Sequence, residues 1–459
     1  MEGKENLDME AKESRVGLAI HILLVFIAGI YPLLLFEVDF GSFALQHLIL
    51  FLCTMGVLLY CVLLIRSGKW EIHFPRTRVN LMVAILAAYS LIRILYKIVI
   101  TNEENLESFG YEIVVLAMAA LYVLIMSRPV FREFYFDILL YSSLVVFALL
   151  LIKYFCGNGV DGAIAVLLQD KSGIGSYTVL VCMAGVWQYI KCEDKLRSFF
   201  YLGVLVIGFF VLFVNQSRVS FWIMAAVFIA VPILQRPTAE LVKRDMTVFF
   251  IYLFLLCNMS LITSYTNLLY IDVTFDLEQS VYLELLIALG GICFFRYWDR
   301  IPEGVDLRRL VMRRMRRGYQ FLLRSMSVIA AGMILGGNLW KELPDRFGMK
   351  AWKGFAIPFI DEINQEKSTF YLCFEQFGVI GSLLLLSLCV LLVAELKKKY
   401  RFDKPVTGML VLISGVFLAQ LLFWKVSISI LPVYWMFLVL AISYKEKEEK
   451  WSVTKIKFE

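Results

Sequence analysis

A tight polar break between two apolar segments holds the first residues that could carry chemistry. It reads Gln216-Ser217-Arg218 and has apolar runs on both sides. A planar guanidinium can bind phosphate oxygens through two parallel hydrogen bonds, so an arginine at the membrane surface suits a phosphate or pyrophosphate near the lipid headgroups. The alternative is a turn residue whose charged end reaches the interface. The break by itself leaves both readings open.

A second polar segment, residues 337–367, interrupts the apolar sequence further along the chain. It carries the basic residues Lys341, Arg346, Lys350, Lys353 and Lys367, and several aromatic residues lie between them. Such a loop suits an anionic lipid-linked ligand, with its aromatic side chains at the membrane interface or stacked on sugar rings. The alternative is a solvated cap whose positive charges pair with neighbouring carboxylates.

Charged residues inside apolar segments form the third group of candidates. Arg93 and Lys97 are four residues apart, which places them on one face of a helix. A charge at membrane depth costs ~2.5–3.5 kcal/mol on insertion scales and is a functional hypothesis by default. The competing interpretation is a buried structural ion pair, for which Glu375 and Glu284 are the candidate partners of Arg93.

The composition shows which elements must position these residues. Of the 459 residues, 60% are hydrophobic, and the mean hydropathy is +0.75. Soluble domains are nearer 45–50% apolar, and an apolar helix of about 20 residues crosses a bilayer. We therefore expect an all-α, polytopic integral membrane protein with about 14 transmembrane helices. The expected spans are roughly Gly17–Val38, Ser42–Ile65, Val79–Ile100, Tyr111–Ser127, Phe136–Phe155, Ile174–Ile190, Phe199–Val214, Phe221–Leu234, Thr247–Ser264, Val281–Phe295, Phe321–Gly336, Phe370–Leu396, Thr407–Trp424 and Ile428–Tyr444.

The distribution of positive charge sets the expected orientation. Segments on the side of the two termini contain about four times as many Lys and Arg residues as those on the opposite side, which predicts cytoplasmic termini. Residues 1–16 and 445–459 are then cytoplasmic tails, and 17–444 form a single membrane domain. The break at Arg218 and the extended loop 338–368, between spans 11 and 12, face outwards. The expected location is the cytoplasmic (inner or plasma) membrane.

Several classes of function are disfavoured by the motifs that the chain lacks. It has no Gly-x-x-x-x-Gly-Lys-Ser/Thr, so no nucleotide-driven pump is indicated. The cysteines show no metal-binding spacing, and the histidines are His21, His47 and His73, so neither a metal site nor a Ser-His-Asp triad is expected. The basic residues lie in short loops between spans, which indicates no nucleic-acid partner.

Two motifs, taken in order, resemble the O-antigen ligase and O-antigen polymerase family. Gln216-Ser217-Arg218 before an apolar span is similar to that family's Ser-Arg-Gly segment. Ser368-Thr369-Phe370-Tyr371-Leu372, followed by Glu375 and Gly378-Val379-Ile380-Gly381, is similar to its Tyr-Leu and Gly-x-x-Gly signature. The resemblance covers residues 199–396. Val219 replaces the glycine of the first motif, and the loop has no histidine where ligases have one, which favours a polymerase-like member.

The resemblance implies a metal-independent glycosyltransferase of cell-surface polysaccharide biosynthesis in the cell envelope, with no cofactor. Its substrate would be oligosaccharide repeat units on undecaprenyl pyrophosphate, polymerised at the outer membrane face. Arg218 and Arg346 would hold the pyrophosphate, and Asp345, Asp361 or Glu362 would accept the proton of the acceptor hydroxyl. The residues expected to bind substrate are Gln216, Ser217, Arg93, Lys350, Lys353, Tyr371 and Glu375. Membrane lipid and other polysaccharide assembly proteins are further expected partners.

Alternatives from other classes stay open. A flippase or exporter of lipid-linked oligosaccharides has a similar length and number of spans and also uses arginines within the membrane, but it should show two similar halves, and no repeat is visible here. An O-antigen ligase-type transferase is a second alternative. A transporter or structural membrane protein in which the buried charges are only ion pairs is a third.

Overall fold

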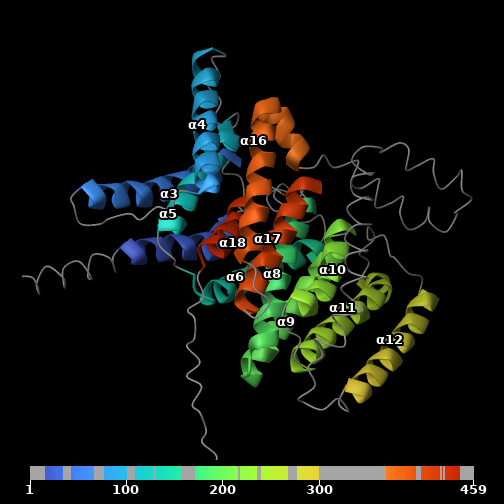
Figure 1. Cartoon of the computed structure of the whole chain (residues 1–459). Coiled ribbons are helices and arrows are strands. Elements are labelled where there is room, and N and C mark those ends of the chain that lie inside the picture. The colour runs from blue at the N-terminus through green and yellow to red at the C-terminus, as the bar shows by residue number, and fades with distance from the viewer. Residues whose placement is uncertain are drawn as a thin grey trace, which may run out of the picture.

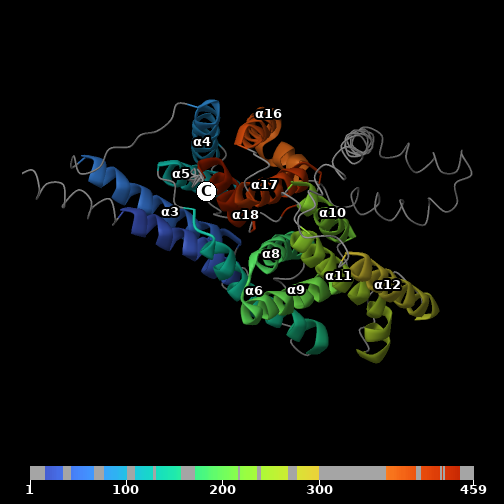
Figure 2. The same cartoon turned by 60° about the horizontal axis from the view of Figure 1, so that its bottom comes forward.

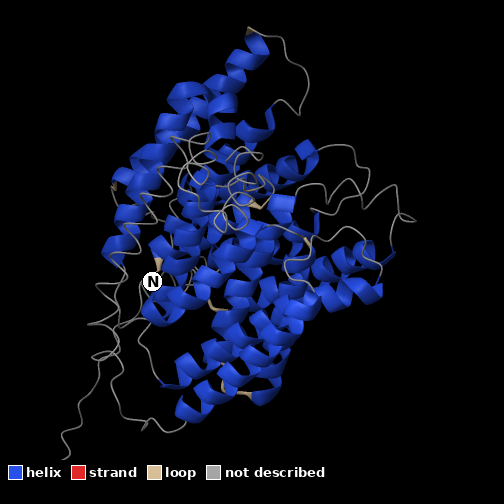
Figure 3. Cartoon of the chain, turned by 90° about the vertical axis from the view of Figure 1, so that its right-hand side faces the viewer, coloured by secondary structure: helices blue, strands red, loops and turns tan. Residues whose placement is uncertain are grey.

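The computed structural model describes residues 16–34, 43–66, 77–100, 109–127, 131–156, 171–215, 218–234, 239–266, 277–298, 369–399, 405–423, 426 and 430–444. These residues are almost entirely helical, and no strand occurs among them (Figure 3). Residues 16–25 are α-helical and lead into η1 (Phe26–Ile30) and α2 (Tyr31–Leu34). The other helices are α3 (Phe43–Arg66), α4 (Arg78–Val99), α5 (Gly110–Ser127), α6 (Phe134–Cys156), α8 (Lys171–Lys191), α9 (Lys195–Val214), α10 (Arg218–Leu234), α11 (Ala239–Thr266), α12 (Leu277–Trp298), α16 (Thr369–Lys399), α17 (Pro405–Phe423) and α18 (Leu431–Ser443).

Among the described residues, helices form where the apolar segments predict them. The expected span Val79–Ile100 coincides with α4, and Tyr111–Ser127 coincides with α5. The expected span Phe321–Gly336 and the loop 338–368 lie outside the described residues. All-α architecture is therefore confirmed for the part of the chain that the structure describes.

The helices have the length and surface of membrane helices. Within the described ranges, eight are long and apolar enough to cross a bilayer, among them Arg78–Val99, Gly110–Ser127 and Phe377–Lys398. Large apolar side chains are exposed along α4 and α12, as at Leu81 and Leu286. A contiguous apolar surface of this kind is unfavourable in water, so it faces lipid. The chain is a multi-pass membrane protein.

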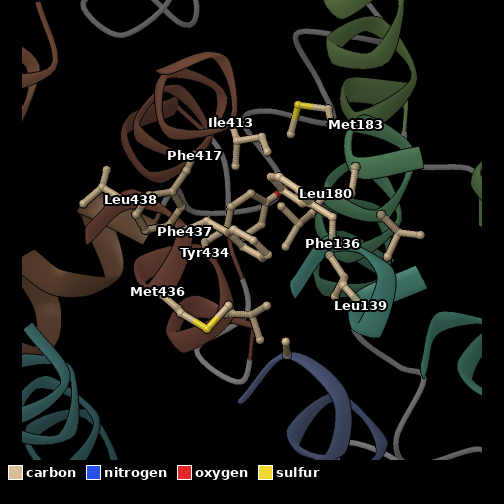
Figure 4. Packing of buried hydrophobic residues seen from close by; sticks show 14 of the residues in the cluster. Phe136, Leu139, Leu180, Met183, Ile413, Phe417, Tyr434, Met436, Phe437 and Leu438 are labelled. Carbon is tan, nitrogen blue, oxygen red and sulfur yellow. The ribbon is translucent and has the colours of Figure 1, made fainter. Parts of the chain in front are cut away.

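The core surrounds α18, which is buried from its second residue to its end. All residues from Pro432 to Ser443 are buried, because other helices cover this 13-residue helix on every side. Its rings stack on neighbours: Phe437 lies parallel to Phe136 of α6 at 5.1 Å, and Tyr434 lies on Phe417 of α17 at 5.1 Å (Figure 4). The stacked rings fix α18 between α6 and α17.

The helices that carry the candidate site lie on one side of α18. α5 packs against α3, α4 and α18, and α16 packs against α4 and α17 (Figure 1). The helices α8 to α12 form the other side of the molecule, with α12 at its edge against α11 (Figure 2). α17 contacts both α10 and α16, so it lies between the two groups.

Polar contacts hold the N-terminal end of α6 against α8 and α9, and hold α11 against the end of α8. The Asp137 carboxylate accepts hydrogen bonds from Gln188 Nε2 at 3.0 Å and from the Tyr201 hydroxyl at 2.9 Å. Arg244 of α11 donates to the carbonyls of Tyr189 and Cys192 at the end of α8. These contacts satisfy polar groups that the bilayer could not hydrate, and we assign them a structural role.

Candidate functional site

Three charged side chains meet where α4 ends and α5 begins. Glu112 Oε1 lies 3.1 Å from Arg93 Nε and 3.0 Å from Lys97 Nζ. The Glu112 side chain is 1% exposed, against 23% for Arg93 and 14% for Lys97. Among the described residues, two positive charges therefore face one negative charge.

The local sequence explains why these residues meet. Lys97 is the third residue from the end of α4, and Glu112 is the third residue of α5. Because the two helices pack together, those positions lie at matching depth. Arg93 is one turn earlier on the same face of α4, so its guanidinium reaches the same carboxylate. Charges that would each be costly inside the membrane are thereby paired.

An aromatic residue of α16 completes the cluster. The Arg93 guanidinium lies over the Phe377 ring, 5.3 Å from its centroid, and Lys97 Nζ lies 5.8 Å from the centroid of the Phe109 ring. The negative face of an aromatic ring attracts a cation. The cation–π contact ties the start of α16, which follows loop 338–368, to the charged end of α4.

The helical path of α16 breaks directly after Phe377. Gly378 has φ 68° and ψ −173°, a region that is essentially restricted to glycine. The Tyr89 hydroxyl of α4 donates a 2.6 Å hydrogen bond to the Phe377 carbonyl. At Gly381, an added Cβ would clash with Phe377 Cβ and lie 3.0 Å from Tyr89 Cε1. Both glycines of the Gly-x-x-Gly segment thus have a physical reason, one in backbone conformation and one in close packing.

An apolar cavity of about 70 Å³ lies next to the cluster. Helices α4, α5, α16, α17 and α18 line it, with residues that include Leu86, Met118, Leu388 and Trp435. Tyr111 and Phe377, whose rings meet edge to face at 6.2 Å, also line it. Phe377 therefore separates the charged cluster from the cavity and contacts both.

The structure describes one side chain among the residues predicted to act on substrate, that of Arg93. Arg218 is the first residue of α10, and Tyr371 and Glu375 lie in the first part of α16; the side chains of these three are not described. The other predicted residues lie outside the described ranges: Gln216, Ser217, Asp345, Arg346, Lys350, Lys353, Asp361 and Glu362. The segment of Tyr371 and Glu375 comes to Arg93 through Phe377, whereas α10 packs on α8, α11 and α17.

Of the two carboxylates considered as ion-pair partners of Arg93, Glu284 is not its partner, and the side chain of Glu375 is not described. The structure pairs Arg93 with Glu112, whereas Glu284 lies on α12, which packs against α11. Glu112 was missed from the sequence because it stands at the start of a span, where a carboxylate near water needs no explanation. The matching depths of Lys97 and Glu112 in consecutive spans are the signal that could have found it.

A second buried carboxylate lies in α11. Asp245 is 0% exposed, and neither of its carboxylate oxygens has a hydrogen-bond partner in the described part of the chain. It precedes the predicted span Thr247–Ser264, and burial raises the pKa of its carboxyl to about 8. No cluster of His, Cys, Asp and Glu suited to a metal ion occurs among the described residues.

Comparisons with known proteins identify no relative. The chain matches no protein-family model, no curated protein and no solved structure.

The chemistry of the charged cluster itself indicates what the site can bind. Across the described residues, Arg93 hydrogen-bonds through Nε alone, which leaves its two terminal nitrogens for a ligand. A guanidinium and an ammonium beside an apolar cavity suit an anionic group attached to a hydrocarbon chain.

Proposed function

We propose that the protein is a membrane glycosyltransferase that polymerises undecaprenyl-pyrophosphate-linked oligosaccharide repeat units. It would work at the outer face of the cytoplasmic membrane, in the synthesis of a cell-surface polysaccharide. In this proposal the chain has 14 spans with both termini in the cytoplasm, and the end of α4 and the start of α5 and α16 face outwards. The proposal extends the resemblance to the O-antigen ligase and polymerase family.

The observation that carries the proposal is the contact between Arg93 and Phe377. It joins an intramembrane cation to the first part of α16, one residue before the break in the Gly-x-x-Gly segment. Loop 338–368 leads into this same segment. A substrate with an anionic headgroup and a hydrocarbon chain would find cations and an apolar cavity at one place.

The proposed reaction uses residues of the loop and of the break before α10. The acceptor hydroxyl oxygen attacks the anomeric carbon of the donor sugar, and the bond between that carbon and the pyrophosphate oxygen breaks. The lipid pyrophosphate leaves with the electron pair, and Arg218 and Arg346 stabilise its charge. A loop carboxylate, Asp345, Asp361 or Glu362, accepts the hydroxyl proton.

The test uses purified protein in liposomes with a labelled undecaprenyl-pyrophosphate-linked repeat unit. A ladder of longer chains on a gel, lost in Arg218→Ala and in Arg346→Ala, is the expected result. Arg197→Ala is a matched control, because Arg197 is a 73%-exposed arginine at the start of α9. Full activity in both site variants would contradict the assigned roles. Protection of the labelled headgroup that changes with time, without a ladder, would replace the proposal with a flippase.

A further inference from the structure

We infer that Arg93 and Lys97 form an anion site and that Glu112 is its internal counterion. Glu112 occupies the site until the phosphate of a polyprenyl phosphate displaces it. The inference rests on the proposed function for the kind of lipid, and it assigns to Glu112 control of the site's affinity. The chain of that lipid enters the apolar cavity behind Phe377.

The charge and geometry of the cluster fit an anion. Arg93 and Lys97 both contact one oxygen of Glu112, so these two cations share one carboxylate among the described residues. The two terminal nitrogens of Arg93 carry no hydrogen bond within the described residues. A phosphate has more acceptor oxygens than a carboxylate and can accept two parallel hydrogen bonds from a guanidinium.

The present position of Glu112 leaves it incompletely satisfied. Its second oxygen, Oε2, is buried and has no hydrogen-bond partner in the described part of the chain. A buried polar atom without a partner is rare in proteins and calls for a specific reason. A carboxylate that occupies a site for another anion supplies that reason. The two cations bind one of its oxygens and leave Oε2 without a hydrogen-bond partner among the described residues.

The cavity gives the anion site its preference for a lipid. Phe377 has Arg93 over its ring and lines the cavity with Tyr111. A ligand whose phosphate lies at Arg93 can therefore pass its chain beside these two rings. The volume of about 70 Å³ is under half of the ~150 Å³ cavity that accepts benzene in an engineered protein. The cavity therefore has room for no more than one short branched unit of the chain, and the rest of the chain lies in the bilayer.

Binding to the intact protein in phosphatidylcholine nanodiscs tests the inference directly. The probe is a labelled polyprenyl phosphate, titrated into wild type, Arg93→Met and Glu112→Gln. We expect Glu112→Gln to bind roughly tenfold more tightly or better, because a unit charge a few ångströms from the phosphate is removed. Arg93→Met should bind at least roughly tenfold more weakly. Glu193→Gln and Arg197→Met, both at exposed positions, should match the wild type.

The same titration contains the results that overturn the inference. Unchanged or weaker binding by Glu112→Gln would show that Glu112 orients Arg93 rather than competing with the ligand. If that variant does not fold, Glu112→Asp keeps the charge on a shorter side chain and should also bind more tightly. Equal affinity for phosphatidylglycerol would overturn the polyprenyl chain as occupant. Equal affinity for inorganic phosphate would overturn the role of the cavity.

Failure of the inference and failure of the proposed function give different results. If wild-type protein builds a ladder but Glu112→Gln binds no more tightly, the counterion role is wrong and the polymerase stands. If wild-type protein builds no ladder but the variants bind as expected, the lipid site stands and the polymerase does not.

Discussion

The Tyr89 hydroxyl donates a 2.6 Å hydrogen bond to the carbonyl of Phe377, 288 positions away in the chain. Tyr89 lies on α4, one turn before Arg93, and Phe377 lies on α16 directly before the glycine break. The break at Gly378 interrupts the helical backbone at this point, and the tyrosine supplies a donor to the adjacent carbonyl. This bond and the contact of Arg93 with the Phe377 ring hold the same residue from both its backbone and its side chain.

Gly381→Ala should destabilise the protein because Gly381 packs closely against Phe377 and Tyr89, which leave no room for a methyl group. The added Cβ would clash with Phe377 Cβ, an atom close to the backbone that cannot rotate away. Overpacking of this kind costs typically about 1–3 kcal/mol. A lower melting temperature in detergent is the expected result. The control is Gly415→Ala in α17, where nothing lies within 4 Å of the added atom; equal melting temperatures for the two variants would contradict the packing described.

Gly378→Ala tests the backbone break separately from the packing. No atom lies within 4 Å of an added Cβ at this position, so any effect comes from the conformation at φ 68°. That conformation costs a non-glycine residue of order 1–3 kcal/mol. We expect loss of stability together with loss of chain elongation, because Phe377 would leave the Arg93 guanidinium. A variant with wild-type melting temperature and activity would show that the break is not required.

Much of the fold could be predicted from the sequence because hydropathy and helix length suffice for a membrane helix. The expected span Thr407–Trp424 and the helix α17, Pro405–Phe423, differ by two residues at the start and one at the end. The expected span Ile428–Tyr444 contains a shorter helix, α18, from Leu431 to Ser443. Its regular part begins later because Pro432 stands in the first turn of α18, where its fixed φ suits a helix start.

The candidate site could be predicted only in part, because the periodicity of one helix does not show which other helix packs against it. The four-residue spacing of Arg93 and Lys97 correctly placed both on one face. Their partner Glu112 depends on which helix packs beside α4, and the hydropathy of single spans does not contain that information. The contact with Phe377 spans most of the chain, so no local pattern indicates it.

Asp245→Asn should raise stability, and the gain should grow with pH. Burial raises the pKa of this carboxyl to about 8, against ~3.9 in an unfolded chain. Between these values the folded protein binds more protons than the unfolded one, so wild-type stability falls as pH rises through this window and levels off above about pH 8. Asparagine has no proton to lose and keeps the shape of the neutral acid.

Melting temperatures at pH 5, 6, 7 and 8 check this prediction. The difference in the free energy of unfolding between Asp245→Asn and wild type, taken from the same melting curves, should widen with pH. It should widen by at most about 1.4 kcal/mol per pH unit, because one titrating group changes stability by no more than that. Glu193→Gln, at an exposed position, should show a constant difference from wild type. A constant difference for Asp245→Asn as well would mean that the carboxyl is ionised in the folded protein across this range.

Ala119→Phe should block the cavity while leaving the charged cluster in place. Ala119 lines the cavity from α5, and a phenyl ring there would fill the space into which we place the lipid chain. We expect polyprenyl phosphate to bind roughly tenfold more weakly, since the chain loses its apolar contacts, and chain elongation to decline in parallel. Ala84→Phe is the control, because Ala84 is exposed on the surface of α4 and a ring there enters lipid. Wild-type binding by Ala119→Phe would place the hydrocarbon chain elsewhere on the protein, whereas weaker binding confined to this variant would locate the chain beside Phe377.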